Sequence, residues 1–229
     1  MSDRVLRRHA VRVWLPDRPG GLGAIASRVG AVGAEIVGIE IVDREGGQAV
    51  DDLLVQLPPG VTTDLLVREI GEVDGARVED VRDLEDAPPD ARLQALETAC
   101  SLAEAPAELV IEELTAHAHR DNGADWTVTI DLDDGTVLAE RGDHPGAGWV
   151  HAYAVGSLAG ADGERTGSGS TEDDAVCVPI GADGGRRQAL TLGRTGRGFR
   201  RREHEALRLM ASLAAARLAS CESASDRTH

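Results

Sequence analysis

Aromatic residues are scarce in this sequence and lysine is missing. Phe, Trp and Tyr together supply 2% of its 229 residues, and all 24 basic residues are arginines. Any packed core must therefore consist mainly of Val, Leu, Ile and Ala, because hydrophobic residues still reach 41%. The 40 acidic residues give a net charge of -16, which repels nucleic-acid phosphates, so we expect no nucleic-acid partner.

Cysteine and long apolar runs are scarce as well. Cys100, Cys177 and Cys221 are far apart and odd in number, a pattern that indicates neither a disulfide framework nor a zinc site. No segment approaches the roughly 18 apolar residues of a membrane-spanning helix, and residues 1–10 lack the apolar segment of a signal peptide. The sequence therefore predicts a cytoplasmic protein with no membrane partner, no metal and no other cofactor.

The most informative segment that is present covers residues 11–25, VRVWLPDRPGGLGAI. Val11, Val13 and Leu15 alternate as in a strand, and a proline- and glycine-rich turn then leads directly into apolar residues at helical spacing. Backbone N–H groups and the positive end of the helix dipole meet at such a junction. The segment is therefore suited to binding a small anion such as an amino-acid carboxylate.

The residues that follow continue the alternation of strand and helix. They predict a strand over 36–42, a hairpin turn over 45–48, a strand over 50–57, a helix capped by Thr62 or Thr63, and a strand over 76–84. The resulting β-α-β-β-α-β order places two helices on one face of an antiparallel sheet, which is the ferredoxin-like arrangement.

The turn and this order of elements resemble the ACT family of small-molecule-sensing domains, which carries a D/N-R-P-G-x-L segment at this junction. The resemblance covers residues 9–84 and implies an amino-acid site in which Asp17 accepts a hydrogen bond from the ligand's ammonium. It also implies that Gly20, Gly21 and Leu22 hold the carboxylate, while Glu35 comes from a partner subunit. The expected ligand-binding residues are Asp17, Arg18, Gly20, Gly21, Leu22, Glu35 and Ile36. Asp17 and Glu35 are acids where the family often has amides, which is consistent with a cationic ligand or with a lost site.

Beyond an acidic, proline-bearing linker at 85–91, the chain predicts a second domain over 92–221 and a disordered tail over 222–229. Leu93, Leu96 and Cys100 share one helical stripe, and Pro106 starts a helix that runs to His119. Four strands are expected, at 126–132, after the turn at 133–135, at 176–180 and at 188–192, with a loop over 159–174 and a final helix over 202–220. Residues 149–158 fit either a helix or a strand, and the i, i+4 spacing of Trp149 and Tyr153 favours the helix.

The C-terminal part of this domain resembles GAF domains. The stretch AVCVPIGADGGRRQALTLGRTGRGFRRREHEALRLMASLAAARLA has a V-P-I strand, a hairpin, an apolar strand, a G-R…F turn and an amphipathic helix. With four strands where the family usually has six, the resemblance implies a reduced α/β/α GAF-like domain with an antiparallel sheet. The fold class expected for the whole chain is α+β.

Three other patterns have competing interpretations. Residues 21–26 satisfy the dinucleotide fingerprint G-x-G-x-x-A, but a hairpin return after the next strand is incompatible with a Rossmann unit. His117 and His119 form H-x-H, but on a helix their side chains diverge by about 200°. The arginines between 194 and 202 could bind a phosphate or an acidic partner. We favour the interpretation that they lie at the start of a helix, where Glu203 and Glu205 neutralise them.

The sequence contains none of the common catalytic motifs: G-x-S-x-G, H-E-x-x-H, Ser-x-x-Lys and the Walker sequence are absent. We therefore expect a non-enzymatic, ligand-responsive regulator that binds a free amino acid or a related small molecule. One alternative is a structural adaptor that associates with a protein partner without a ligand. A third is a GAF-type reductase that uses Cys177. Arg12 and Trp14 should lie on the sheet face away from the helices. Either a second subunit or the GAF-like half folded back across the linker should cover them, and we favour a homodimer.

Overall fold

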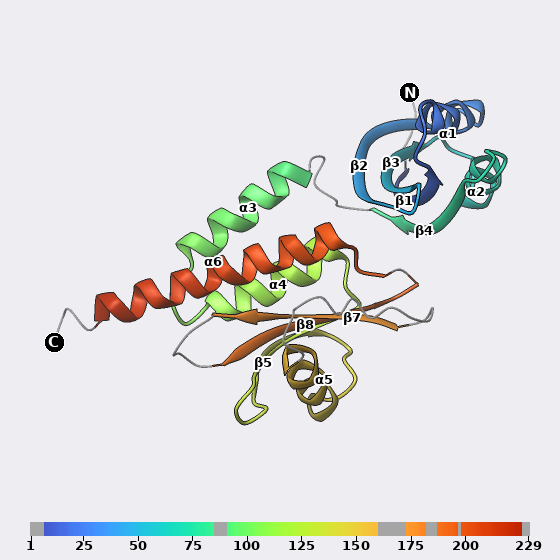
Figure 1. Ribbon diagram of the computed structural model, residues 1–229. Coiled ribbons are helices and arrows are strands. Elements are labelled where there is room, and N and C mark those ends of the chain that lie inside the picture. The colour runs from blue at the N-terminus through green and yellow to red at the C-terminus, as the bar shows by residue number, and fades with distance from the viewer. Residues whose placement is uncertain (1–6, 85–90, 160–172, 182–186, 197, 226–229) are drawn as a thin grey trace. The chain divides into compact units, whose positions relative to one another are not determined.

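A computed structural model describes residues 7–84, 91–159, 173–181, 187–196 and 198–225. The chain divides into two compact units, 1–90 and 91–229, and each has a mixed α/β fold with its own antiparallel sheet (Figure 1). The expected linker falls on residues 85–91, of which 85–90 lie outside the described residues.

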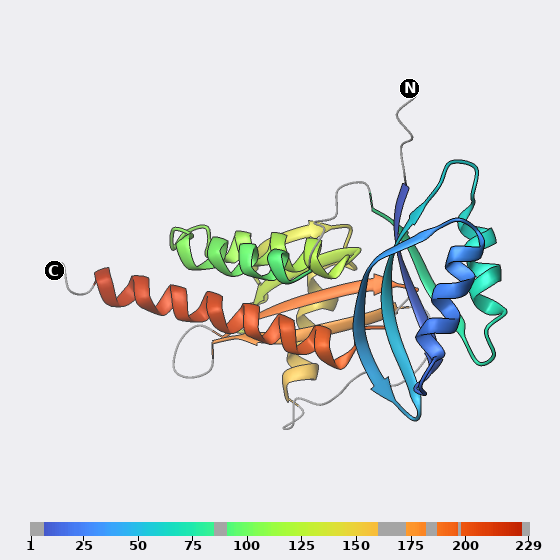
Figure 2. The same ribbon diagram turned by 90° about the horizontal axis from the view of Figure 1, so that it is seen from above.

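The first unit has the predicted β-α-β-β-α-β order. Its elements are β1 (Arg7–Pro16), α1 (Gly21–Ala31), β2 (Glu35–Glu45), β3 (Gln48–Leu57), α2 (Thr63–Gly71) and β4 (Arg77–Asp83). The strands lie in the order β2-β3-β1-β4, and every neighbouring pair is antiparallel. Both helices cover the same face of this sheet (Figure 2).

Alternation and local turn chemistry account for these elements. Val11 and Val13 of β1 are fully buried and pack with Ile25 of α1 and Leu66 of α2. Thr62 caps α2 by accepting a hydrogen bond from the backbone N–H of Leu65 at 3.3 Å, as its sequence position predicts. The turn between β2 and β3 needs two consecutive glycines, Gly46 and Gly47, because both have positive φ angles of 59° and 77°.

The second unit is built on four described strands. Its elements are α3 (Ala91–Glu104), α4 (Val110–Asn122), β5 (Trp126–Asp131), β6 (Val137–Gly142), α5 (Ala147–Ala159), β7 (Asp173–Ile180), β8 (Gln188–Thr195) and α6 (Arg201–Ser225). The sheet order is β6-β5-β8-β7. α4 and α6 pack on one face of this sheet and α5 on the other (Figure 1).

Two helix ends differ from the sequence prediction. α6 continues to Ser225, so residues 222–225 are helical and the expected disordered tail over 222–229 is wrong there; residues 226–229 lie outside the described part. α4 begins at Val110, because the residues after Pro106 form a turn before the helix starts. The segment that could be helix or strand is helical in α5, and 160–172 of the expected loop lie outside the described residues. None of the helices that the structure describes is long and apolar enough to cross a membrane.

Candidate functional site

The turn between β1 and α1 starts a helix without a side-chain cap. Gly20 is the N-cap residue, with a left-handed backbone at φ 89°, and no acidic residue occupies the first turn of α1. The first backbone bond of the helix runs from the N–H of Ala24 to the carbonyl of Gly20 at 2.9 Å. The N–H groups of a first turn have no partner within their own helix, so α1 can offer them to a ligand.

The three glycines of this turn have different environments. A Cβ on Gly21 would lie 3.0 Å from the carbonyl oxygen of Pro16 and 3.4 Å from Leu15, and the N–H of Gly21 donates to Arg18 O at 3.1 Å. Gly21 is therefore required by the packing of α1 on β1. A Cβ on Gly20 or Gly23 would meet nothing within 4 Å, so the open side of the turn is at those two residues.

Charged side chains flank the turn on both sides. The N–H of Asp17 donates to the carbonyl of Gly47 at 2.9 Å, which joins the turn to the β2–β3 hairpin. The carboxylate of Asp17 lies 3.8 Å from Nη1 of Arg44 on β2. On the other side, Nη2 of Arg18 lies 3.7 Å from the carboxylate of Asp74. Asp17 and Arg18 are exposed, so water weakens both ion pairs.

A third acid near the turn, Asp51, was not identified from the sequence. It lies on β3 opposite Val13 of β1 and Ile41 of β2. Its side chain is 4% exposed, and its Oδ1 has no hydrogen-bond partner among the described residues. Burial raises the pKa of the Asp51 carboxyl group above its usual value of 3.8; Arg44 opposes this effect, while Asp17 and Asp52 add to it. The sequence signal was strand alternation: Ala49 and Leu53, two residues before and after Asp51, are buried core residues, so Asp51 shares their face of the strand.

Glu35 and Ile36 lie at the other end of the same sheet. Glu35 pairs with Gln56, which also pairs with Arg8 near the start of β1. Pro16, at the end of β1, pairs with Gln48. Arg8 and Pro16 are eight residue steps apart along β1, a distance of about 27 Å. A single chain therefore brings together Asp17, Arg18, Gly20, Gly21 and Leu22, but not Glu35 or Ile36.

The sheet face opposite the helices carries charged pairs. Arg12 binds Asp52 through two contacts, Nε to Oδ1 at 2.7 Å and Nη2 to Oδ2 at 2.8 Å. The guanidinium of Arg77 lies 4.3 Å from the centre of the Trp14 ring. Trp14 is therefore partly covered by a cation within its own unit, a contact that the sequence analysis did not predict.

The candidate residues of the second unit have structural partners. Burial raises the pKa of the Cys177 thiol to about 11, with a smaller opposing effect from the neighbouring Thr191 side chain. A thiol of this kind remains protonated at neutral pH and is a poor nucleophile. Arg194 donates to the carbonyls of Asn122 at 2.9 Å and Gly198 at 2.7 Å and to the carboxylate of Glu203 at 2.9 Å, so it joins β8 to α6.

The two histidines of α4 have different partners. Nε2 of His117 lies 3.3 Å from the Glu113 carboxylate, while Nδ1 of His119 lies 3.3 Å from the hydroxyl of Thr127 on β5. Burial lowers the pKa of His119, and the Arg141 charge adds to this effect. Among the described residues, no three His, Cys, Asp or Glu side chains are grouped as metal ligands.

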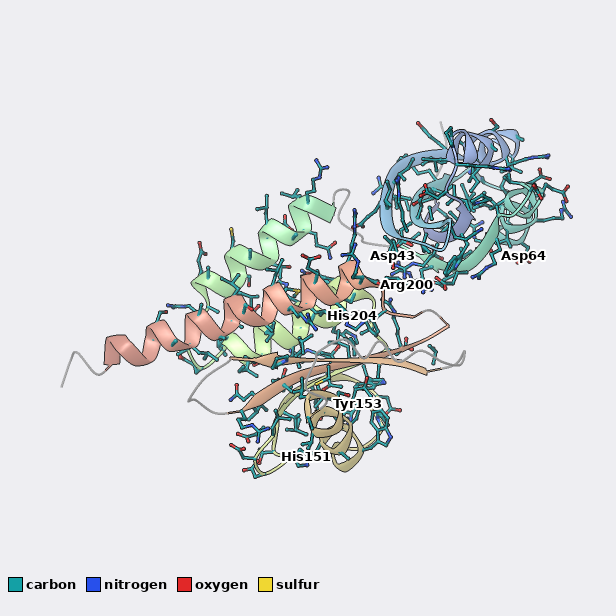
Figure 3. The ribbon with its side chains drawn as sticks, in the orientation of Figure 1. Asp43, Asp64, His151, Tyr153, Arg200 and His204 are labelled. Carbon is teal, nitrogen blue, oxygen red and sulfur yellow. The ribbon has the colours of Figure 1, made fainter. Side chains whose placement is uncertain are left out.

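An aromatic cluster lies on the α5 side of the second sheet, where Figure 3 labels Tyr153 and His151. The rings of Trp149 and Tyr153 are stacked with centroids 5.2 Å apart, and Trp126 meets Trp149 edge-on at 6.1 Å. The hydroxyl of Tyr153 donates to the carbonyl of Ala175 at 2.5 Å. The cluster thus attaches α5 to β5 and β7.

No family model matches the chain, and no curated protein matches it. Solved structures are similar to parts of it. The GAF domain of a phosphoenolpyruvate-protein phosphotransferase from Coxiella burnetii is 15% identical over 59% of this chain and 96% of that one, with a TM-score of 0.43. The corresponding Acinetobacter GAF domain is 10% identical over 58% of this chain and 94% of that one, with a TM-score of 0.41. A bacteriophytochrome from the photosynthetic bacterium R. palustris is 8% identical over 80% of this chain and 42% of that one, with a TM-score of 0.44.

Proposed function

We propose that this chain is a non-enzymatic, ligand-responsive regulatory protein. Its first unit is an ACT-like, ferredoxin-like domain that binds a free amino acid or a close relative at the β1–α1 turn. Its second unit is a reduced GAF-like domain that responds to that event or transmits it. The chain acts in the cytoplasm as a homodimer.

The observation that carries this proposal is the uncapped start of α1 beside acidic groups. The helix begins at Gly20 without a side-chain cap, and the first turn favours a negatively charged group. Asp17 lies in the same turn, and Asp51 lies on the strand face that α1 covers. An α-amino acid carries both charges that these groups attract, a carboxylate and an ammonium.

A thermal-shift measurement with each of the twenty L-amino acids tests the proposal. A ligand that binds only the folded state stabilises it by RT ln(1 + [L]/Kd), which is about 2.7 kcal/mol at a hundredfold excess over Kd. We expect at least one amino acid at millimolar concentration to raise the unfolding temperature. No shift with any of the twenty would reject amino-acid binding.

An adaptor function is the second candidate, and the surface of α3 favours it. Leu93 and Leu96 are 47% and 63% exposed, and Cys100 on the same stripe is exposed too. An apolar stripe of this kind is typical of helices that associate with another protein. If this function is right, Leu96→Glu disrupts association in light scattering or pull-down, whereas Ala95→Glu, on an exposed residue outside the stripe, does not. The third candidate, a reductase that uses Cys177, is disfavoured by the raised pKa of that thiol.

A further inference from the structure

Asp51 places a carboxyl group in the apolar layer between the first sheet and its helices. It faces the same side of the sheet as Val13, Leu53 and Ile41, its partners or neighbours in β1, β3 and β2. It is 4% exposed, and its Oδ1 has no hydrogen-bond partner in the described part of the chain. A buried carboxylate in this state is costly, because its lost hydration is not replaced.

Asp52, the next residue, has the charged partner that Asp51 lacks among the described residues. Asp52 lies on the opposite face of the sheet and receives two hydrogen bonds from Arg12 at 2.7 and 2.8 Å. Asp51 makes no such ion pair with any residue that the structure describes; the cation whose charge acts on it, Arg44, makes its ion pair with Asp17 at 3.8 Å. A cation from outside the chain would supply the partner that Asp51 lacks.

The position of Asp51 relative to α1 limits what this cation can be. Leu15 lies two residues beyond Val13 on the same face of β1, and its Cδ1 is 3.4 Å from where a Cβ of Gly21 would be. Two strand residues span about 7 Å, so Asp51 and the first turn of α1 are within the length of a small ligand. The helix start favours an anion and Asp51 favours a cation.

We propose that Asp51 binds the ammonium group of a zwitterionic α-amino acid whose carboxylate lies at the first turn of α1. This inference rests on the function proposed for that turn. The ion pair of Asp17 with Arg44 is long, at 3.8 Å, and exposed to water, so Asp17 adds a second negative charge that attracts the ammonium and repels a further carboxylate. Amino acids with neutral side chains therefore bind better than aspartate or glutamate, and amines without a carboxylate bind more weakly.

The test is calorimetry on the full chain with the twenty L-amino acids, repeated with Asp51→Asn and with Asp64→Asn. Asn keeps the shape of Asp and removes the charge. Asp64 is an exposed acid in the first turn of α2 and is the matched control (Figure 3). We expect Asp51→Asn to weaken binding by about 10- to 100-fold, the usual effect of losing a charge-assisted hydrogen bond, and Asp64→Asn to leave it unchanged.

A second measurement does not depend on amino-acid binding. Methylammonium chloride is compared with sodium chloride at equal concentration in thermal shift, with the same three proteins. We expect methylammonium to stabilise the unaltered chain and Asp64→Asn, and not Asp51→Asn. If Asp51→Asn does not fold, the same comparison is made on the unaltered chain at two pH values. Stabilisation by methylammonium should then be weaker at a pH low enough to protonate Asp51.

The outcomes separate the two proposals. Amino-acid affinity that is unchanged in Asp51→Asn overturns the role of Asp51 and leaves the proposed function standing. Stabilisation by methylammonium that requires Asp51, without binding of any amino acid, supports the cation site and rejects the amino-acid function. If neither probe stabilises the chain, both proposals are rejected.

Discussion

Asp51 and Asp52 are chemically identical neighbours with opposite environments, because successive residues of a strand face opposite sides of a sheet. Asp52 makes a two-contact ion pair with Arg12. Asp51 is buried among apolar residues, and burial raises its pKa. A one-residue change of register would exchange these environments.

The raised pKa of Asp51 makes the stability of the free protein depend on pH. The folded state holds the Asp51 proton more tightly than the unfolded chain, whose carboxyl has a pKa near 3.8. The group therefore lowers stability as pH rises through the folded-state pKa, and its full cost is present at neutral pH. An increase of 1 in the folded-state pKa lowers the free energy of unfolding at neutral pH by about 1.4 kcal/mol.

We predict that Asp51→Asn is more stable than the unaltered protein at pH 7, and that the difference disappears as the pH falls toward 3.8. Urea unfolding across this pH range measures both. Asp64→Asn should be slightly less stable than the unaltered protein at pH 7, because the start of α2 favours a negative charge. An Asp51→Asn variant that is less stable than the unaltered protein at pH 7 would show that the carboxylate has a partner.

Two glycines of α1 provide a matched pair for testing the turn. Gly23, in the first turn, and Gly30, near the end, are both exposed helical residues around which a Cβ would meet nothing within 4 Å. We predict that Gly23→Val weakens ligand binding at least about tenfold, because a branched side chain would cover the N–H groups of the first turn. Gly30→Val should leave binding unchanged in calorimetry.

Both substitutions replace a helical glycine and should change stability by similar, small amounts of about 0.5 kcal/mol. Equal affinities of the two variants for a ligand of the unaltered protein would place the site away from the turn. Gly21→Val is unsuitable for this test, because its Cβ would press on the carbonyl of Pro16 at 3.0 Å and disturb the fold.

At the scale of elements, the sequence was sufficient to predict a helix or strand where one face of that element is buried. Alternation at Val11 and Val13, and helical spacing at Ile25 and Val29, predict the strand and helix that the structure contains, since these four residues are all fully buried. The paired glycines of the β2–β3 turn and the Thr62 cap were predicted from local chemistry alone.

Long-range pairing was not predictable in this way. Arg12 and Asp52 are 40 residues apart, and their contact depends on the register between β1 and β3. Alternation fixes which residues share a face but not which partners stand opposite each other. Alternation with Ala49 and Leu53 could have placed Asp51 on the core face, whereas the residues that stand opposite it depend on the register.

We predict that residues 1–86 fold alone, because their described strands and helices close a core within the first unit. Circular dichroism of this fragment should show mixed helix and strand and a single cooperative thermal transition. Leu66→Ala, which removes a fully buried side chain, should lower its stability by about 2–5 kcal/mol. A fragment that remains unfolded would mean that the first unit needs the rest of the chain.

At the scale of the whole molecule, the distance between Asp17 and Glu35 bears on assembly. The two residues lie at opposite ends of one sheet and are separated along the strand direction by at least about 27 Å. No single ligand of amino-acid size can touch both in one chain. If Glu35 takes part in binding, as the ACT resemblance implies, it must come from a second subunit.

We predict that chains carrying Asp17→Asn and chains carrying Glu35→Gln each bind ligand poorly alone and regain binding when mixed. In a symmetric dimer each site combines the turn of one subunit with the β2 start of the other, so a mixed dimer contains one unaltered site. Random exchange makes half of the dimers mixed, so about a quarter of all sites should recover full affinity in calorimetry. The matched control is the Asp17→Asn chain alone at the same total concentration, which should recover no binding. Full binding by the Glu35→Gln chains alone would show that the site is complete within one subunit, and light scattering at the mass of one chain would reject the dimer itself.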